Sequence, residues 1–142
     1  MNKPAHSLQL TRQLPHPRER VFSALTDPAK MAQWFFPPGG SAKVTNDLRP
    51  GGDYRIEMSG GKGSVPQGTY LEIVPPERLV FTWLPCSGGA TLTKVTVELF
   101  EQLEGTKLIL THELPEEQVA GHREGWIMCL GHLELYLGGK KP

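Results

Sequence analysis

The sequence has no long apolar run and no excess of charge of either sign. Its 142 residues carry fifteen basic and fifteen acidic side chains, for a formal net charge of zero, without a basic cluster. Binding to nucleic acid through phosphate contacts is therefore not expected. No apolar stretch approaches the ~20 residues that span a bilayer, and the first ten residues lack the apolar core of a signal peptide. We expect a cytoplasmic protein without a membrane span.

Cysteine is also scarce, and the residues that bind metals are scattered. Cys86 and Cys129 lie far apart and form no metal or redox spacing. His112 and His122 have no carboxylate spaced to complete a metal site with them. We therefore predict no metal and no cofactor.

Groups that could perform catalysis are equally hard to assemble. The acidic residues of the expected strands fall on their outward-facing positions: Glu57, Glu72 and Glu98. The segment 61–64 differs from a phosphate-binding loop because no helix follows it and Pro66 intervenes. It is better interpreted as a flexible hairpin tip. No catalytic residue is predicted.

The composition is that of one ordinary globular domain, with 38% hydrophobic and 21% charged residues. A chain of this length can bury a single substantial core. We expect one domain over residues 1–142, with a core from about 8 to 137.

Proline and glycine punctuate the first part of the chain. A strand is predicted at 6–13 and a helix at 18–25, which Pro17 introduces. Asp27 and Pro28 then begin a second short helix, which carries Met31, Trp34 and Phe35 on one face. After it, apolar residues recur every second position, which indicates strands joined by short turns. These strands are expected near 41–48, 54–58, 68–74, 79–83, 95–99 and 108–112.

The C-terminal segment predicts one long amphipathic helix between Pro115 and Gly138. Its apolar stripe comprises Val119, His122, Trp126, Cys129, Leu130, Leu133 and Leu137. Gly121, Gly125 and Gly131 lie inside the helix, where each costs about 1 kcal/mol relative to alanine. This cost suggests either a close contact or an adjoining space. The predicted fold is α+β: a curved antiparallel sheet of six to seven strands wrapped around this helix, with two short helices after the first strand.

Seven segments, in order, resemble a known family. They are 20–28, Trp34-Phe35, 50–55, 70–73 with 75–79, Thr111-His112, Gly125-Trp126, and the final leucines Leu130, Leu133 and Leu137. This series is similar to the START-like, helix-grip superfamily, in the branch named after the activator of heat-shock-protein-90 ATPase, homologue 1-like. The similarity extends from about Leu8 to Leu137.

The resemblance implies a deep, usually apolar cavity between the sheet and the long helix. Carried onto this chain, its wall comprises Trp34, Phe35, Tyr54, Ile56, Met58, Tyr70, Phe81, Trp83, His112, Trp126 and Leu130, with His122 near the mouth. The same large side chains could instead be ordinary core. His112 could be a satisfied interior side chain, or could orient a polar ligand group and titrate near neutral pH. Phe36 is expected near the surface or under the loop at Gly39-Gly40.

Three functions fit these residues. The first is binding of a small apolar or aromatic molecule in the cavity, without chemistry. The second is a chaperone-associated interaction module that acts through its surface. The third, which we rank last, is an enzyme of the cyclase or hydrolase kind that depends on His112.

Overall fold

The computed structural model describes residues 6–60, 65–84 and 92–142. Within these ranges the elements follow the predicted order. They are β1 (His6–Leu14), α1 (Arg18–Thr26), α2 (Pro28–Met31), β2 (Ser41–Asn46), β3 (Asp53–Ser59), β4 (Gln67–Val74), β5 (Arg78–Trp83), β6 (Thr93–Gln102), β7 (Gly105–Leu114) and α3 (Glu116–Leu137). The hairpin tip predicted at 61–64 and the loop around Cys86 lie outside the described residues.

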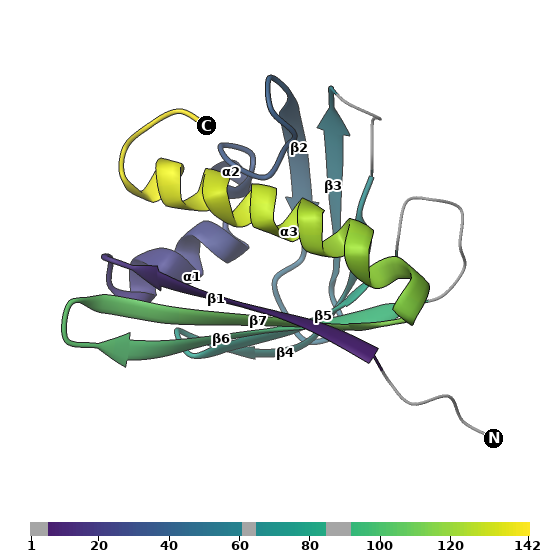
Figure 1. Ribbon diagram of the computed structural model, residues 1–142, viewed down its shortest axis with the longest axis horizontal. Coiled ribbons are helices and arrows are strands. Elements are labelled where there is room, and N and C mark those ends of the chain that lie inside the picture. The colour runs from purple at the N-terminus through teal and green to yellow at the C-terminus, as the bar shows by residue number, and fades with distance from the viewer. Residues whose placement is uncertain (1–5, 61–64, 85–91) are drawn as a thin grey trace.

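The strands form one antiparallel sheet in the order β1-β7-β6-β5-β4-β3-β2. The first strand, β1, pairs along its whole length with the last one, β7, from His6 opposite Leu114 to Leu14 opposite Thr106. The remaining strands follow as consecutive hairpins, so that β2 forms the opposite edge. Figure 1 shows α3 lying across the concave side of this sheet. The fold is therefore the predicted α+β helix-grip arrangement.

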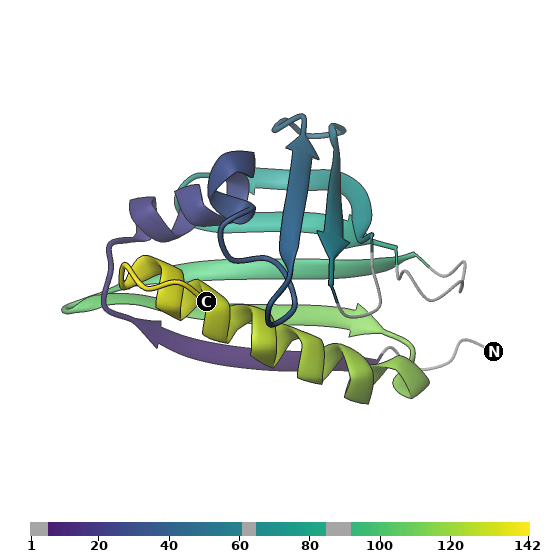
Figure 2. The same ribbon diagram turned by 90° about the horizontal axis from the view of Figure 1, so that it is seen from above.

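The sheet bends where β3 leaves β4. These two strands pair only between Asp53–Arg55 and Gln67–Thr69, and the β4–β5 register is irregular between Tyr70 and Glu72. Such irregularities sharpen the local bend and twist of a sheet. Figures 1 and 2 show that β2 and β3 consequently run across α3, whereas β1 and β7 run alongside it. The helices α1 and α2 close one end of the resulting trough.

The α3 helix forms where the sequence predicts it, between Pro115 and Gly138. Glu116 and Glu117 occupy its first turn, where acidic side chains favour the positive end of the helix dipole. Its inward stripe is buried at Trp126, Cys129, Leu130, Leu133 and Leu137, while Val119 and His122 are half-buried. Burial of one leucine side chain contributes about 1.5–3 kcal/mol, so this stripe holds the helix in the sheet.

The second short helix differs from the prediction. It ends at Met31, and Trp34 and Phe35 lie in the turns that follow, although both are buried as expected. The backbone tightens there because Gln33 N–H donates to the Lys30 carbonyl oxygen. The Trp34 indole N–H then donates to the Ala24 carbonyl oxygen at 2.9 Å and holds this segment against α1.

Phe36, which follows these two aromatic residues, is half-buried. Its ring centroid lies 5.5 Å from that of His132. Phe36 therefore packs against α3, and this contact joins the α2–β2 connection to the long helix.

The glycines of α3 do not mark a close contact. Gly121 and Gly125 are exposed, and a Cβ atom added at either of them, or at Gly131, would meet no other atom within 4 Å. The expectation that the helix is pressed against a strand at these positions is therefore wrong, because α3 uses a different stripe for packing. The alternative, that the glycines adjoin an internal space for a guest, does not fit either, because Gly121 and Gly125 are exposed to solvent.

Replacing Gly125 with alanine should therefore stabilise the protein. Gly125→Ala removes backbone freedom from the unfolded chain without a clash, and we expect the free energy of unfolding to rise by about 0.5–1 kcal/mol in chemical denaturation. Gly68→Ala is the control, because its Cβ would overlap the Thr82 carbonyl oxygen, and it should destabilise by about 1–3 kcal/mol. A loss of stability in Gly125→Ala would contradict the open position of this glycine.

Candidate functional site

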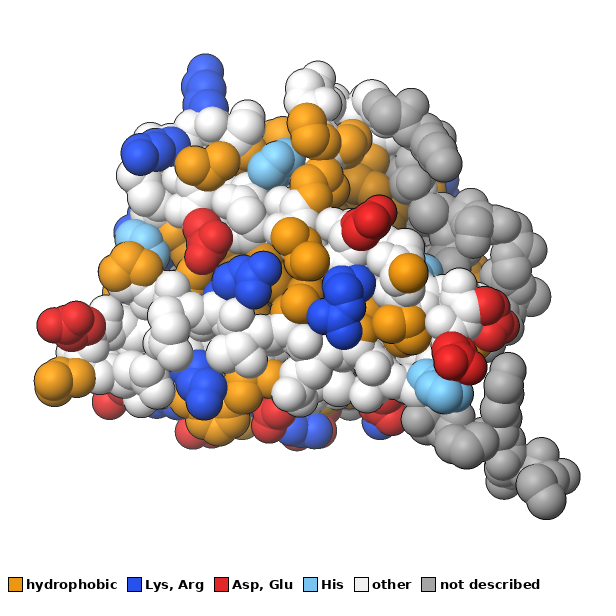
Figure 3. Space-filling model, in the orientation of Figure 1, with side chains coloured by type: hydrophobic (Ala, Val, Ile, Leu, Met, Phe, Trp, Pro, Cys, Tyr) orange, Lys and Arg blue, Asp and Glu red, His pale blue; other side chains and the backbone are white. Residues whose placement is uncertain are grey.

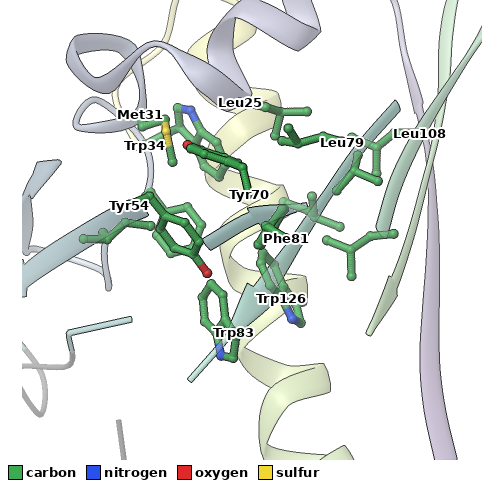
Figure 4. Close-up of a pocket in the computed structure, with 15 residues that line it drawn as sticks. Leu25, Met31, Trp34, Tyr54, Tyr70, Leu79, Phe81, Trp83, Leu108 and Trp126 are labelled. Atoms are coloured by element: carbon green, nitrogen blue, oxygen red, sulfur yellow. The ribbon is translucent and has the colours of Figure 1, made fainter. Parts of the chain in front are cut away.

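An apolar cavity lies between the inner face of the sheet, α3 and the α1–α2 end of the trough (Figure 4). It is lined by Leu25, Met31, Trp34, Phe35, Tyr54, Ile56, Tyr70, Leu79, Phe81, Trp83, Val97, Leu108, Leu110, Trp126 and Leu130. Its volume is about 30 Å³, which is room for about two water molecules. Among the described residues, the interior is thus largely filled by side chains, and this cavity is much smaller than the deep one that the resemblance implies.

Nine of the twelve predicted site residues line this cavity: Trp34, Phe35, Tyr54, Ile56, Tyr70, Phe81, Trp83, Trp126 and Leu130. They come together because alternate positions of β3, β4 and β5 point into the trough, where the inward stripe of α3 meets them. Whether they contact a ligand stays a prediction. The prediction missed Leu25, Met31, Leu79, Val97, Leu108 and Leu110, although the strand members of this group lie on the same inward-facing positions.

Met58, His112 and His122 do not line the cavity. Met58 follows the point at which β3 separates from β4, and it is only half-buried. His112 lies beyond the indoles of Trp83 and Trp126, with ring centroids 6.0 and 6.2 Å away. His122 packs on the ring of His112 at 5.0 Å, one step further from the cavity.

The aromatic rings form one continuous network across the trough. The Trp83 and Trp126 rings lie 5.0 Å apart and join β5 to α3. Phe35 joins the α2–β2 connection to this pair, at 6.1 Å from Trp83 and 5.9 Å from Trp126. Tyr54 lies 5.5 Å from Tyr70 and 5.5 Å from Phe81. The predicted convergence of aromatic residues from distant segments is therefore present in the structure.

Most polar atoms in the cavity wall are already paired within the protein. Trp34 donates to a carbonyl of α1, as described above, and the Tyr54 hydroxyl donates to the Thr82 carbonyl oxygen. The Tyr70 hydroxyl accepts a hydrogen bond from the Asn46 amide at 3.0 Å. Burial raises the pKa of both tyrosines, so that both remain neutral.

His112 is completely buried and belongs to a chain of hydrogen bonds. The Trp126 indole N–H donates to His112 Nδ1 at 3.0 Å, and an indole nitrogen can only donate. His112 must therefore carry its proton on Nε2, which lies 2.7 Å from Thr93 Oγ1. The Thr93 hydroxyl in turn donates to the Trp83 carbonyl oxygen at 2.8 Å. We call this chain the Trp126–Trp83 relay; it joins α3 to three strands.

The relay decides between the two interpretations of His112. Burial and the neighbouring His122 lower its pKa from 6.5 to about 3, so the ring is neutral at physiological pH. Both ring nitrogens form hydrogen bonds within the protein. His112 therefore matches the first interpretation, a satisfied interior side chain, and not the second, a group that titrates near neutral pH. His122 Nδ1 donates to the Gln118 carbonyl oxygen at 3.0 Å, within α3.

The other candidate groups for chemistry are buried or form ion pairs. Cys129 is buried on the inward stripe of α3, and burial raises the pKa of its thiol to about 12, which disfavours the thiolate. Glu72 and Glu98 lie on the outer side of the sheet and pair with Arg78 at 3.1 and 3.2 Å. No cluster of three potential metal ligands occurs in residues 6–60, 65–84 and 92–142.

The fold and the site together define a helix-grip domain whose curved sheet and long helix enclose an aromatic, uncharged interior. The family model described as "Activator of Hsp90 ATPase homolog 1-like protein" matches residues 15–138. The chain belongs to this family, as its resemblance in sequence indicated. No curated protein matches it.

Solved structures support the assignment. Protein CV1439 from Chromobacterium violaceum is 31% identical over 90% of this chain and 94% of its own, with a TM-score of 0.79. CalU16 from Micromonospora echinospora is 29% identical over 97% of this chain and 78% of its own, also with a TM-score of 0.79. DynU16, from the dynemicin biosynthetic locus, is 27% identical over 98% of this chain and 49% of its own, with a TM-score of 0.80.

The face that carries α3 mixes charged and apolar side chains (Figure 3). None of the helices in the described part of the chain is long and apolar enough to cross a membrane. On the face that carries α3, positive and negative side chains are interspersed (Figure 3). Apolar side chains gather above α3 on this face, over β2 and β3, whose Ala42, Val44 and Met58 are only partly buried.

The relay predicts a characteristic acid sensitivity. Below about pH 6.5 the unfolded chain binds a proton at His112 that the folded protein takes up only near pH 3. The free energy of unfolding should therefore fall between these two pH values, by up to a few kcal/mol from this residue. His112→Gln keeps a donor and an acceptor but does not titrate, so its stability should change less over this range.

The measurement is urea denaturation at several pH values for both proteins, so that titrating carboxylates common to both cancel in the comparison. Parallel profiles for the wild type and the variant would contradict the buried, neutral state of His112.

Proposed function

We propose that this protein binds a small, uncharged, apolar or aromatic molecule in the interior between α3 and the sheet. The observation that carries the proposal is the cavity wall: aromatic rings from five separate elements or connections converge there, and none of the described residues that line it is charged. Small-molecule sites are typically apolar clefts with a few placed polar groups. The relative from the dynemicin biosynthetic locus adds a link to small-molecule metabolism.

Binding requires the interior to expand. A cavity of about 30 Å³ is far below the roughly 300–1,000 Å³ of ordinary ligand sites. Among the lining residues, Leu25 and Phe81 are only partly buried, and the others are buried. Leu25 and Met31 lie at the α1–α2 end, and methionine adapts readily to a new neighbour. In our proposal the ligand displaces side chains at this end.

We further propose that binding occurs without catalysis and in the cytoplasm. The neutral, doubly hydrogen-bonded state of His112 and the raised pKa of Cys129 support the absence of a base or nucleophile beside the cavity. The cytoplasmic location is supported only by the sequence, in which the cysteines form no redox spacing.

Titration with neutral bicyclic and tricyclic aromatic molecules, followed by amide and indole NMR, tests the binding proposal. Shifts should concentrate on the residues that line the cavity. Leu25→Trp fills the partly open end and should weaken binding at least tenfold, because the guest and the new indole compete for one space. Leu135→Trp is the matched control, since Leu135 is exposed on the outer side of α3. Shifts scattered over the surface, or equal affinities for both variants, would overturn the proposal.

A chaperone-associated role is the second candidate, and the description of the family supports it. Such a role would use the surface, so it predicts that Leu25→Trp, which changes the cavity, leaves the interaction unchanged. The measurement is pull-down and ATPase stimulation with a cognate heat-shock-protein-90 chaperone. Absence of both contact and stimulation would remove this candidate.

A further inference from the structure

A polar side chain, Asn46, occupies an inward-facing position at the end of β2. The inward-facing residues before it on this strand, Ala42 and Val44, are apolar. The Asn46 amide nitrogen donates to the Thr26 carbonyl oxygen at 2.7 Å and to the Tyr70 hydroxyl oxygen at 3.0 Å. An amide nitrogen carries two hydrogens, and both are used here. Asn46 therefore clamps the end of α1 to the wall of the cavity.

Residues 18–35, which we call the lid segment, form one unit at the end of the trough (Figure 2). Lys30 Nζ donates to Ser23 Oγ at 2.6 Å and so joins α2 to α1. The Trp34 indole donates to the Ala24 carbonyl oxygen and joins the following turns to the same helix. Because these bonds lie inside the lid segment, it can move as a unit without breaking them.

The lid segment also supplies one side of the cavity wall, with Leu25, Met31, Trp34 and Phe35. Its contacts with the rest of the wall are apolar, as in the approach of the Phe35 ring to that of Trp83. Apolar contact is non-directional, so it opposes separation without fixing one end of the segment more than the other. Movement of the lid segment away from β2 would enlarge the cavity while the strands stay paired.

Polar contacts join this part of the chain to the sheet at opposite ends of α1. At the start, Arg18 pairs with carboxylates of the β4–β5 turn and of β6 at 3.6 and 3.9 Å. Just before it, Thr106 Oγ1 donates to the His16 carbonyl oxygen at 2.7 Å. At the other end, within residues 6–60, 65–84 and 92–142, Asn46 makes the only hydrogen bond from a strand. The helix has nine residues, so the two places lie roughly 13 Å apart.

Resting on the proposed function, we propose that the lid segment pivots at Arg18 and that Asn46 is the latch that holds it closed. When the latch bond to Thr26 breaks, the end of α1 moves with α2 away from β2, and the ligand enters beneath Leu25 and Met31. The anchored start of α1 keeps the segment in place, so that it closes again over the guest. The site therefore opens at one end and not by loosening of the whole sheet.

Native-state hydrogen exchange followed by NMR tests the latch without a ligand. Asn46→Ala removes the bond to Thr26, and the amides of Asp27 and Met31, which are bonded within the lid segment, should exchange faster. The expected factor is about five- to tenfold, which corresponds to one net hydrogen bond. The amide of Val21, at the anchored start of α1, and the amides of β6 and β7 should keep their exchange rates.

Thr106→Val is the matched control. Thr106 and Asn46 each donate to a backbone carbonyl at 2.7 Å, but at opposite ends of α1. The control should accelerate exchange at Val21 and leave Asp27 unchanged. Asn46→Asp is a second latch variant: it keeps the size of the side chain, and at neutral pH its carboxylate has no hydrogen to donate to Thr26. It decides the question if the alanine variant fails to fold.

A fluorescent probe connects the latch to binding. N-phenyl-1-naphthylamine is a neutral aromatic molecule whose fluorescence rises in apolar surroundings. In stopped-flow mixing, Asn46→Ala should bind it about five- to tenfold faster than the wild type, because a larger fraction of the protein is open. Thr106→Val should bind it at the wild-type rate.

The outcomes separate the latch from the proposed function. Equal acceleration of exchange in the lid segment and in β6 and β7 would overturn the latch, because it would indicate a general loss of stability. Equal effects of Asn46→Ala and Thr106→Val on Asp27, or an unchanged rate of probe binding in Asn46→Ala, would also overturn it. If the probe binds to none of these proteins, the proposed function fails, and the exchange pattern alone decides whether Asn46 holds the lid segment.

Discussion

The α3 helix holds the two arms of a bent sheet together because one of its stripes is buried against both the β1–β7 side and the rings that project from β5. A sheet that bends after Arg55 exposes a large apolar inner face, and α3 is the long element available to cover it (Figures 1 and 2). The packing of α3 against the inner face of the sheet sets the arrangement of the cavity wall. It brings Trp126 to within 5.0 Å of Trp83 and leaves the glycines on the opposite, open side.

The Trp126–Trp83 relay makes that contact specific. Hydrophobic burial alone is non-directional and would allow the helix to slide or rotate. A fully buried histidine that accepts from an indole and donates to a threonine fixes the helix against β6 and β7 at one position. Burial, together with the neighbouring His122, lowers the pKa of His112 to about 3, so the ring stays neutral and Nδ1 can accept from the indole. Its role is therefore to position α3, and this accounts for a buried histidine without invoking catalysis.

The sequence predicted the elements and the inward faces well, because period-two and helical spacing follow directly from backbone geometry. It predicted Trp34 and Phe35 as buried but placed them on a helix that ends earlier, at Met31, since the hydrogen bond of Trp34 to Ala24 depends on tertiary contacts. The sequence could not show that His112 lies beyond the indoles. Strand alternation predicts the face of the sheet on which a side chain lies, but not how far along the trough it lies from the cavity. It also could not give the cavity volume, which depends on how side chains interlock.

A nearly filled interior is compatible with binding when one part of its wall can move independently of the rest. On the α3 side, the relay fixes Trp126, and Tyr54 is tied across the sheet to Thr82. At the α1–α2 end, Trp34 bonds only within its own segment, to Ala24, so the segment can shift without breaking that bond. Asn46, which joins the Thr26 carbonyl oxygen to the Tyr70 hydroxyl, is one polar tie between this end and the sheet. Arg18 of α1 supplies another by pairing with Glu77 and Glu101. A ligand that displaces side chains at this end would act on the Asn46 tie.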